Sequence, residues 1–430
     1  MSQCRRSPAL KRRERTPTCW SCITQPFMRQ QAQWCAEDAT LRSLAVLSDF
    51  GKVVGDSRFT SSDLGAVMRQ PGAHVLAAGV PPASVLPLAT ATFTLQDGST
   101  VELNAEDMHL AQRYAPFGWQ AIRTWLQQHV LELHKPPTDD WEICLCSGSM
   151  AGLDAVFRLL LNRGDAVLCE EYTFIASKDL FVAHEAEIIP LAMDEHGLLP
   201  CAVEEACEKR AKAGLPMPKV LYVIPVGQNP TGARLHPERY AMIYEMACKY
   251  GFQILEDDAY YYMQHRVAEP DAPLPGLSEL GPSFLSIDVA GRVVRLDTFS
   301  KALAPGFRLA WLTAPKTFAR KFDGLSYIST QWGCTLSMVI VAKMLQVPGW
   351  FEGHVLELQR AMRRRCRALL EAAETHLAGR ATWRQPQAGM FLWVKMKAPC
   401  HRQALCEAMR RLGVAVMPGE DSAMGAPPHG

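Results

Sequence analysis

The sequence predicts an α/β protein with a large domain built on a mostly parallel sheet and a smaller α+β domain after it. Between residues 147 and 301, short apolar runs rich in β-branched residues alternate with helical stretches. Continuous apolar runs separated by helices are typical of a parallel sheet that is covered on both faces. From about residue 337 the pattern changes to long helices followed by a strand pair, which indicates a second domain of another class.

The individual elements follow from the same patterns. The predicted strands of the sheet are residues 166–169, 187–191, 220–225, 252–255 and 293–296. Before them we expect a helix near residues 63–69, a turn at Pro81-Pro82 and a long helix over residues 118–134. In the second domain we expect a basic helix over residues 356–376 and a strand pair formed by residues 390–396 and 414–417.

Four segments are expected along the chain. Residues 1–50 form a basic segment, residues 51–109 a segment that packs with the small domain, residues 110–336 the large domain and residues 337–430 the small one. In the first thirty residues only Glu14 opposes the cations Arg5, Arg6, Lys11, Arg12, Arg13, Arg15 and Arg29. That composition resembles an organelle transit peptide, but it also fits a disordered tail or a misplaced start. Cytoplasmic and mitochondrial locations both stay open.

Charge and composition exclude several classes of protein. The chain of 430 residues has 45 basic and 44 acidic side chains, whereas a nucleic-acid protein needs an excess of cations. Apolar runs such as residues 220–226 are far shorter than the ~20 residues of a membrane helix. The 14 cysteines are scattered, which favours reduced thiols. Cys19 and Cys22 have no second pair of ligands to complete a zinc site, so we expect no metal.

Polar motifs follow three of the predicted strands. Residues 227–232 read Gly-Gln-Asn-Pro-Thr-Gly, residues 256–260 read Glu-Asp-Asp-Ala-Tyr, and residues 297–301 read Asp-Thr-Phe-Ser-Lys, with Arg308 a little further on. Upstream, Ser147-Gly148-Ser149 opens a helix. Ligands of open α/β sheets bind beyond the carboxyl ends of the strands. We therefore expect these motifs to form one site.

In this order, the motifs resemble those of the fold-type I pyridoxal-phosphate aminotransferases, from about residue 61 to the end. The runs Gly-Gln-Asn-Pro-Thr-Gly, Glu-Asp-Asp-Ala-Tyr-Tyr-Tyr and Leu-Asp-Thr-Phe-Ser-Lys are most similar to aromatic amino acid, kynurenine and 2-aminoadipate aminotransferases. The resemblance implies pyridoxal 5'-phosphate as cofactor, a seven-stranded sheet and a homodimer. It also implies transfer of an amino group from an aromatic or 2-aminoadipate-like amino acid to a 2-oxo acid such as 2-oxoglutarate.

Matching the motifs residue by residue assigns the chemistry. Lys301 corresponds to the lysine that holds the cofactor and then carries a proton as general base and acid. Asp257 corresponds to the carboxylate that keeps the ring nitrogen protonated, since Asp258 points to the other face of the strand. Asn229 and Tyr260 correspond to the donors at the phenolate oxygen.

The remaining cofactor contacts also follow from the resemblance. The phosphate is expected at a helix N-terminus, with a shell made by Ser149, the Met150 and Ala151 amides, Thr298 and Arg308. Phe174 is the expected stacking residue, with Tyr172 as the alternative. Tyr114 of a partner subunit is expected to reach the phosphate, and Gly79 and Asn229 to contact substrate.

One feature departs from the family pattern. Residues 413–419 carry the family's Gly-Val-x-x-x-Pro-Gly turn, but the arginine that should follow and grip the substrate carboxylate is missing before Gly430. We expect an incomplete or alternatively spliced chain of an active family. Two alternatives stay open, namely a paralogue that binds the cofactor with little or no turnover and a β-lyase that uses the same lysine.

Overall fold

A computed structural model describes residues 46–57, 62–68, 70, 72–73, 79–267 and 272–425. The Arg-rich part of the basic N-terminal segment lies outside the described residues. In the part that is described, no helix is both long and apolar enough to span a membrane.

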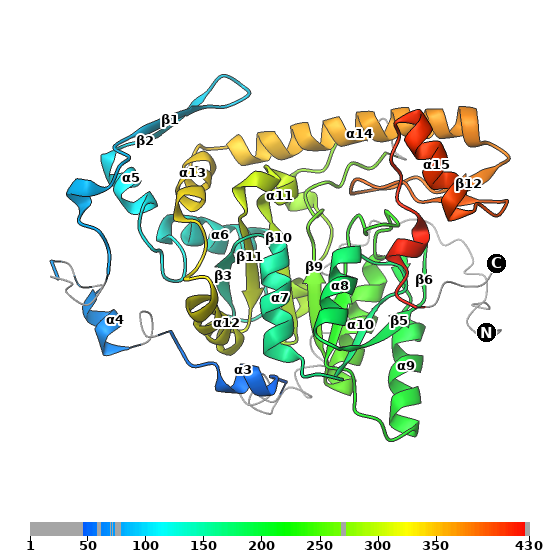
Figure 1. Cartoon of the computed structure of the whole chain (residues 1–430), viewed down its shortest axis with the longest axis horizontal. Helices are drawn as coiled ribbons and strands as arrows, with labels where there is room; N and C mark the ends of the chain where they lie inside the picture. Colours follow the sequence, from blue (N-terminus) through cyan, green and yellow to red (C-terminus); the bar gives the residue numbers. More distant parts are fainter. Residues whose placement is uncertain are drawn as a thin grey trace.

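A seven-stranded sheet forms the centre of the molecule (Figure 1). Its order is β3 (Glu142–Cys146), β11 (Ala310–Ala314), β10 (Val293–Thr298), β9 (Gln253–Asp257), β8 (Val220–Val223), β4 (Ala166–Glu170) and β5 (Glu187–Leu191). Only β11 runs antiparallel to its neighbours, β10 and β3. The predicted mostly parallel sheet is confirmed, with all five predicted strands in it. The pattern did not locate β3 and β11.

Helices cover both faces of this sheet, as continuous apolar strands require. One face packs against α7 (Ser149–Leu160), α8 (Ile175–Ala183) and α12 (Lys316–Ser329), through side chains such as Phe157 and Phe322. The other face packs against α6 (Gln120–Leu133), α9 (Pro200–Lys212), α10 (Pro237–Tyr250) and α13 (Thr335–Leu345), through side chains such as Leu126 and Tyr240. The two cores hold the strands rigidly, so their carboxyl ends can position a site.

The N-terminal elements agree with their predictions. The expected helix near residues 63–69 is α4 (Asp63–Met68), and the expected turn precedes the 3-10 helix η1 (Ala83–Val85). A hairpin of β1 (Ala91–Thr94) and β2 (Thr100–Leu103) then extends away from the body (Figure 1). It leads into α5 (Ala105–Ala111), which begins with a capping box between Asn104 and Asp107. Met108 and Leu103 pack on Val339 of α13.

The C-terminal elements correct one prediction. The expected basic helix is the longer α14 (Trp350–Leu377), which leads to β12 (Ala381–Trp383), β13 (Val394–Met396), α15 (Arg402–Leu412) and the 3-10 helix η5 (Gly419–Ser422). The predicted pairing of residues 390–396 with 414–417 is wrong, because β13 pairs with β12 instead, Ala381 opposite Met396. Residues 414–417 form no strand, and Val416 N–H donates to Met409 Sδ.

The predicted strand over residues 390–396 is also shorter than expected. The strand that forms within 390–396 is β13, Val394–Met396. Residues 387–389 bond to the loop that follows β9: His265 N–H donates to Gln387 O, and Gly389 N–H donates to Met263 O. This segment therefore lies against the loop that carries Tyr260.

Candidate active site

The ends of β8, β9 and the Asn229 loop bring three predicted residues together. Tyr222 in β8 donates a 2.7 Å hydrogen bond to Asp257 Oδ2. The other carboxylate oxygen, Asp257 Oδ1, is buried and has no hydrogen-bond partner among the described residues. Asn229 Nδ2 lies 3.5 Å from the Tyr260 hydroxyl. A buried acceptor without a donor calls for an explanation, and a bound N–H group supplies one.

Burial sets the ionisation of Asp257. It raises the pKa of the carboxyl to about 6, with Asp297 also raising it, while the Tyr222 hydrogen bond and the Arg295 charge lower it. The carboxylate is therefore mostly ionised at neutral pH and can accept a hydrogen bond from a cation. Burial and the charge of Asp257 together raise the pKa of Tyr260, whose hydroxyl stays protonated.

The loop that carries Asn229 is held by Gln228. The Gln228 amide nitrogen donates to Glu170 Oε2 at 3.0 Å and to Tyr172 O at 2.7 Å, and its oxygen accepts from Thr231 N–H at 2.9 Å. Gly227 begins the loop with a φ of +61°, and a Cβ there would lie 2.6 Å from Gly389 Cα. Only glycine fits so close to another backbone at positive φ.

The N-terminus of α7 forms an anion cradle together with Arg308. Gly148 caps this 12-residue helix with a φ of +85°, and the first-turn N–H groups of Ser149, Met150 and Ala151 have no partner within the helix. Arg308 Nη2 donates to Ser147 O at 3.3 Å. A Cβ at Gly148 would collide with the Arg308 guanidinium. Free amides at a helix N-terminus beside a cation favour a phosphate.

A short helix, α11 (Phe299–Ala302), carries Lys301 beside this cradle. The Thr298 hydroxyl caps α11 by accepting from Ser300 N–H at 3.1 Å, and it donates to Ser300 Oγ at 2.9 Å. Arg308 Nη1 lies 3.5 Å from Ser300 Oγ. Ser300 therefore joins the predicted Thr298 and Arg308, although the sequence interpretation had not assigned it. Its place directly before the lysine was the available signal.

Two aromatic residues compete for the stacking position. The Tyr172 ring packs on Trp393, with centroids 5.1 Å apart, and its backbone forms a bridge with Ala423. Phe174 precedes α8 and is half-buried against the core that contains α7. Because Tyr172 is engaged elsewhere, the geometry favours Phe174, and its role stays a prediction.

Two predicted residues do not join the site within one chain. The Tyr114 side chain is 60% exposed, between α5 and α6, and Gly79 is exposed with no atom within 4 Å of an added Cβ. Tyr114 is expected to act on a partner subunit, and its exposure agrees with that expectation. Both assignments stay predictions.

A cavity of about 860 Å³ borders the Asn229 loop, and Tyr172, the alternative stacking residue, is part of its lining. It is also lined by residues such as Thr231, Trp383, Arg384 and Trp393, and none of the other predicted cofactor residues is among its described lining. We therefore take the ends of β8, β9 and β10 as the candidate site. The buried acceptor Asp257 Oδ1, the anion cradle at α7 and the nearby Lys301 together fit pyridoxal phosphate.

The comparisons with known proteins agree with this geometry. The family model of the class I and II aminotransferases matches residues 83–428. The mitochondrial kynurenine/alpha-aminoadipate aminotransferase of Mus musculus is 35% identical over 348 residues, which are 77% of this chain and 79% of that protein. An L-tyrosine:2-oxoglutarate aminotransferase of Tapinella panuoides is 37% identical over 299 residues, 66% of this chain and 56% of that one.

Solved structures give the same result. An aminotransferase of Candida albicans superposes with a TM-score of 0.80 at 27% identity, over 91% of this chain and 90% of that one. A kynurenine aminotransferase of Pyrococcus horikoshii, solved in complex with PMP, KYN and KYA, gives a TM-score of 0.67 at 29% identity, over 73% and 75% of the two chains. With the matched site motifs on the same fold, the chain belongs to the class I and II aminotransferases and is a transaminase.

Proposed function

We propose that this chain uses pyridoxal 5'-phosphate to transfer the amino group of an aromatic or 2-aminoadipate-like amino acid to a 2-oxo acid such as 2-oxoglutarate. The buried, unpartnered Asp257 Oδ1 carries the proposal, because it offers an acceptor where the cofactor's ring nitrogen would need one. The names of the relatives support the donor class. When bound, the cofactor supplies an electron sink for the substrate's Cα carbanion.

The chain's own residues supply binding and proton transfer. Asp257 holds a proton on the ring nitrogen, and Asn229 and Tyr260 donate to the phenolate oxygen. Lys301 Nζ would hold the cofactor covalently until the substrate's amino group replaces it. The freed lysine amine would then take the proton from the substrate Cα as general base and pass it on to the cofactor as general acid.

The phosphate and the ring face need separate contacts. The Ser149 hydroxyl, the Met150 and Ala151 amides, Thr298 and Arg308 bind the phosphate, and Phe174 covers one face of the ring. Gly79 and Asn229 contact the substrate. These contacts fix the reacting groups relative to one another, and such orientation is a large part of enzymatic rate enhancement.

A donor panel tests the substrate class. The full chain, loaded with pyridoxal phosphate, is incubated with 2-oxoglutarate and with kynurenine, 2-aminoadipate, phenylalanine, tyrosine or alanine, and glutamate is measured. We expect glutamate from the aromatic or 2-aminoadipate donors and little from alanine. Glutamate from alanine alone would contradict the donor class. Lyase products such as pyruvate and ammonia without glutamate would favour a β-lyase, and no product from any donor would favour a cofactor-binding paralogue.

We also propose that two copies of the chain form each active site, with Tyr114 acting on the partner's phosphate. Tyr114 is 60% exposed. The apolar side chains of Val85 and Leu88, near the projecting hairpin, are also exposed, at 64% and 49%. Such apolar exposure indicates an interaction surface. Mixing Lys301→Ala with Tyr114→Ala chains tests this: each mixed dimer has one intact site, so activity should return. No recovery from mixed dimers verified by mass would contradict the shared site.

For location, we propose mitochondria. The support is the Arg-rich, acid-poor composition of the first thirty residues and the mitochondrial name of the mouse relative. Fusing residues 1–50 to a fluorescent protein tests it, with a control in which the arginines of that segment become glutamine. Cytosolic fluorescence from both fusions would contradict the proposal.

A further inference from the structure

We propose that Arg295 is a positioning residue of the active site. From the opposite face of the sheet it clamps the strand ends that carry Asp257 and Lys301, and with Asp297 it sets the electrostatic field at Asp257. This inference rests on the proposed role of Asp257 at the cofactor.

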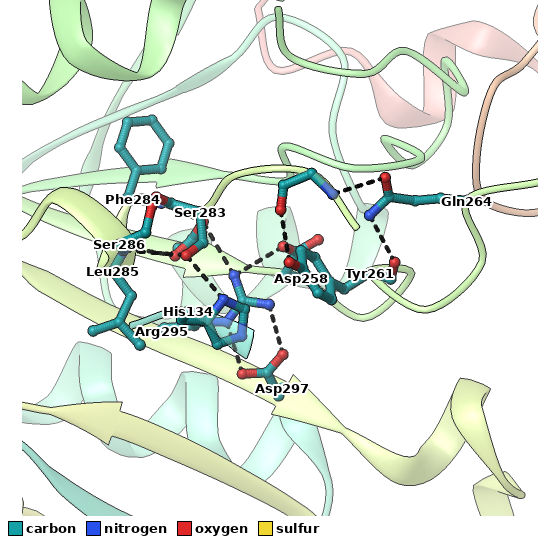
Figure 2. A network of polar contacts seen from close by, with 12 residues as sticks. His134, Asp258, Tyr261, Gln264, Ser283, Phe284, Leu285, Ser286, Arg295 and Asp297 are labelled. Carbon is teal, nitrogen blue, oxygen red and sulfur yellow. Dashed lines mark hydrogen bonds and ion pairs between the residues drawn. The ribbon is translucent and has the colours of Figure 1, made fainter. Parts of the chain in front are cut away.

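The Arg295 guanidinium is completely buried in a cage of carboxylates (Figure 2). Its Nε and Nη2 donate to the two oxygens of Asp297 at 2.9 and 2.8 Å. Its Nη1 donates to Asp258 Oδ2 at 2.9 Å and lies 3.2 Å from Glu256 Oε1. The Tyr261 ring covers its face at 4.7 Å. Each direction of the planar fork is therefore used, which fixes the group as a bidentate pair does.

The register shows how this cage bears on Asp257. In the parallel pair of β9 and β10, Arg295 lies opposite Glu256, and Leu296 lies opposite Asp257. Side chains alternate between the faces of a strand, so Arg295 bonds the residues on both sides of Asp257 while Asp257 itself points to the cofactor side. Glu256 is held in turn by Phe284 N–H at 2.8 Å. The backbone that orients Asp257 is thus fixed from behind.

The same guanidinium also fixes the path to Lys301. Asp297, which takes two of its hydrogen bonds, is directly followed by Thr298. Thr298 caps α11, the helix of Lys301. One side chain therefore ties the end of β9 to the end of β10, and through them the ring-nitrogen partner to the covalent anchor.

The charges of the cage also act on Asp257. One cation faces three carboxylates, and burial raises the pKa of all three, that of Asp258 most clearly. For Asp257, the Arg295 charge lowers the pKa and the Asp297 charge raises it. The two members of the cage therefore act on Asp257 with opposite sign, so removing each one should shift its ionisation in opposite directions.

Other groups packed around the cage do not confuse this effect near neutral pH. Burial and Arg295 lower the pKa of His129 in α6 and of His134, the residue that follows α6, so both are neutral. Burial raises the pKa of the tyrosines that face the cage or Asp257, which are Tyr222, Tyr240, Tyr260, Tyr261 and Tyr262. Burial raises the pKa of Asp257 to about 6 and that of Glu170, which holds the Asn229 loop through Gln228, to about 8. Neither Arg295 nor Asp297 contributes to the shift of Glu170, so a shift of the binding curve in variants of those two residues reports the ionisation of Asp257.

Stability does not explain the cage well. Burying charges is costly, and replacing a buried ion cluster by apolar residues is often neutral or stabilising. Arg295 and its partners also lie on the ends of the two strands that carry the chemistry. A role in positioning accounts for both facts.

The test is the pH dependence of pyridoxal-phosphate affinity, titrated into the full chain from pH 5 to 8. Binding should weaken as pH falls and Asp257 takes up its proton. Arg295→Gln removes the charge that lowers the pKa of Asp257. The pH at which cofactor affinity falls should therefore rise by about half to one unit. Asp297→Asn removes the charge that raises the pKa of Asp257, so affinity should fall at a lower pH than in wild type. Arg295→Lys keeps the positive charge but loses the planar guanidinium. Cofactor affinity should therefore fall at the same pH as in wild type, while kcat falls at nearly unchanged KM.

Arg292→Gln is the matched control. This arginine is also buried and lies close to Arg295 in the chain, but it donates to Gly251 O at the other end of β10. Its loss should leave the pH at which cofactor affinity falls unchanged. If the Arg295→Gln variant does not fold, the Asp297→Asn and Arg295→Lys variants still test the positioning role of Arg295. Shifts of equal sign, or none in folded variants, would overturn the inference. Failure of the wild-type chain to bind the cofactor would instead overturn the proposed function.

Discussion

The strands β8 to β10 and the region from α15 to η5 are both rich in apolar residues, yet they differ sharply in burial. Every residue of β8, β9 and β10 is buried. Helix α15 has no buried residue, and Leu412, Val414 and Met417 are 67%, 56% and 59% exposed. An apolar pattern therefore indicates a core only where neighbouring elements cover it.

This difference bears on function. A buried strand is fixed by its ladder and by packing on both faces, so a side chain at its end can be held in a defined place. Asp257, Thr298 and Lys301 lie at or just after such ends. The α15 region contributes fewer contacts and should tolerate change.

Lys301→Ala should abolish turnover. It removes both the covalent anchor and the proton carrier, and general acid–base catalysis alone contributes about 10²–10⁴-fold. The measurement is the rate of glutamate formation with the best donor. Lys316→Ala, an exposed lysine that begins α12, is the control and should keep wild-type activity. Substantial turnover by the Lys301 variant would contradict the assignment.

Leu255→Ala should lower the free energy of unfolding by about 2–5 kcal/mol, since it leaves a cavity in a packed core. Leu255 in β9 is 0% exposed. Leu412→Ala, the same change in α15, should cost less than about 0.5 kcal/mol. Urea denaturation measures both. Equal losses would show that the α15 region is packed as tightly as the sheet.

Asp257→Asn should weaken cofactor binding by about 10- to 100-fold, because a charged hydrogen bond of about 1.5–3 kcal/mol is lost. The direct readout is titration of the chain with pyridoxal phosphate. Asp288→Asn changes another buried aspartate, which bonds Tyr244 rather than the site, and serves as control. An unchanged affinity in the Asp257 variant would place the ring nitrogen elsewhere.

Tyr222→Phe should have a smaller effect that depends on pH. The hydroxyl donates to ionised Asp257 and lowers its pKa, so the variant raises that pKa above about 6. Cofactor affinity, which needs the ionised form, should then be lost at a higher pH on acidification. Tyr244→Phe removes a similar bond to Asp288 and should not move the curve. If Tyr222→Phe instead lowered the pH at which cofactor affinity is lost, the result would contradict this role of the Tyr222 hydroxyl.

The order of the motifs along the sequence, together with the family resemblance, located the candidate site, and the roles of its residues stay predictions. Asp257 ends β9, and Tyr260 and Lys301 come soon after the ends of buried strands. The rule that ligands bind at the carboxyl ends of such strands predicts that these residues lie close together. Local apolar runs predicted five of the seven strands, because those runs are short-range signals, and the family resemblance implied the sheet of seven.

Features that depend on register between distant segments were missed. Tyr222 reaches Asp257 across neighbouring strands, and Arg295 meets Glu256 only because β9 and β10 pair in one particular register. Residues 414–417 have a strand-like composition, but β13 pairs with β12. Pattern alone does not say which strands meet.

One spectroscopic comparison tests directly whether Lys301 holds the cofactor of a transaminase. Wild type and Lys301→Ala are loaded with pyridoxal phosphate, and the visible absorption of each is recorded before and after kynurenine or 2-aminoadipate is added without any 2-oxo acid. We expect a lysine-linked band in wild type only, which the donor converts to the absorption of the aminated cofactor and which 2-oxoglutarate restores. The same band in Lys301→Ala, or a wild-type band that no donor changes, would contradict the account.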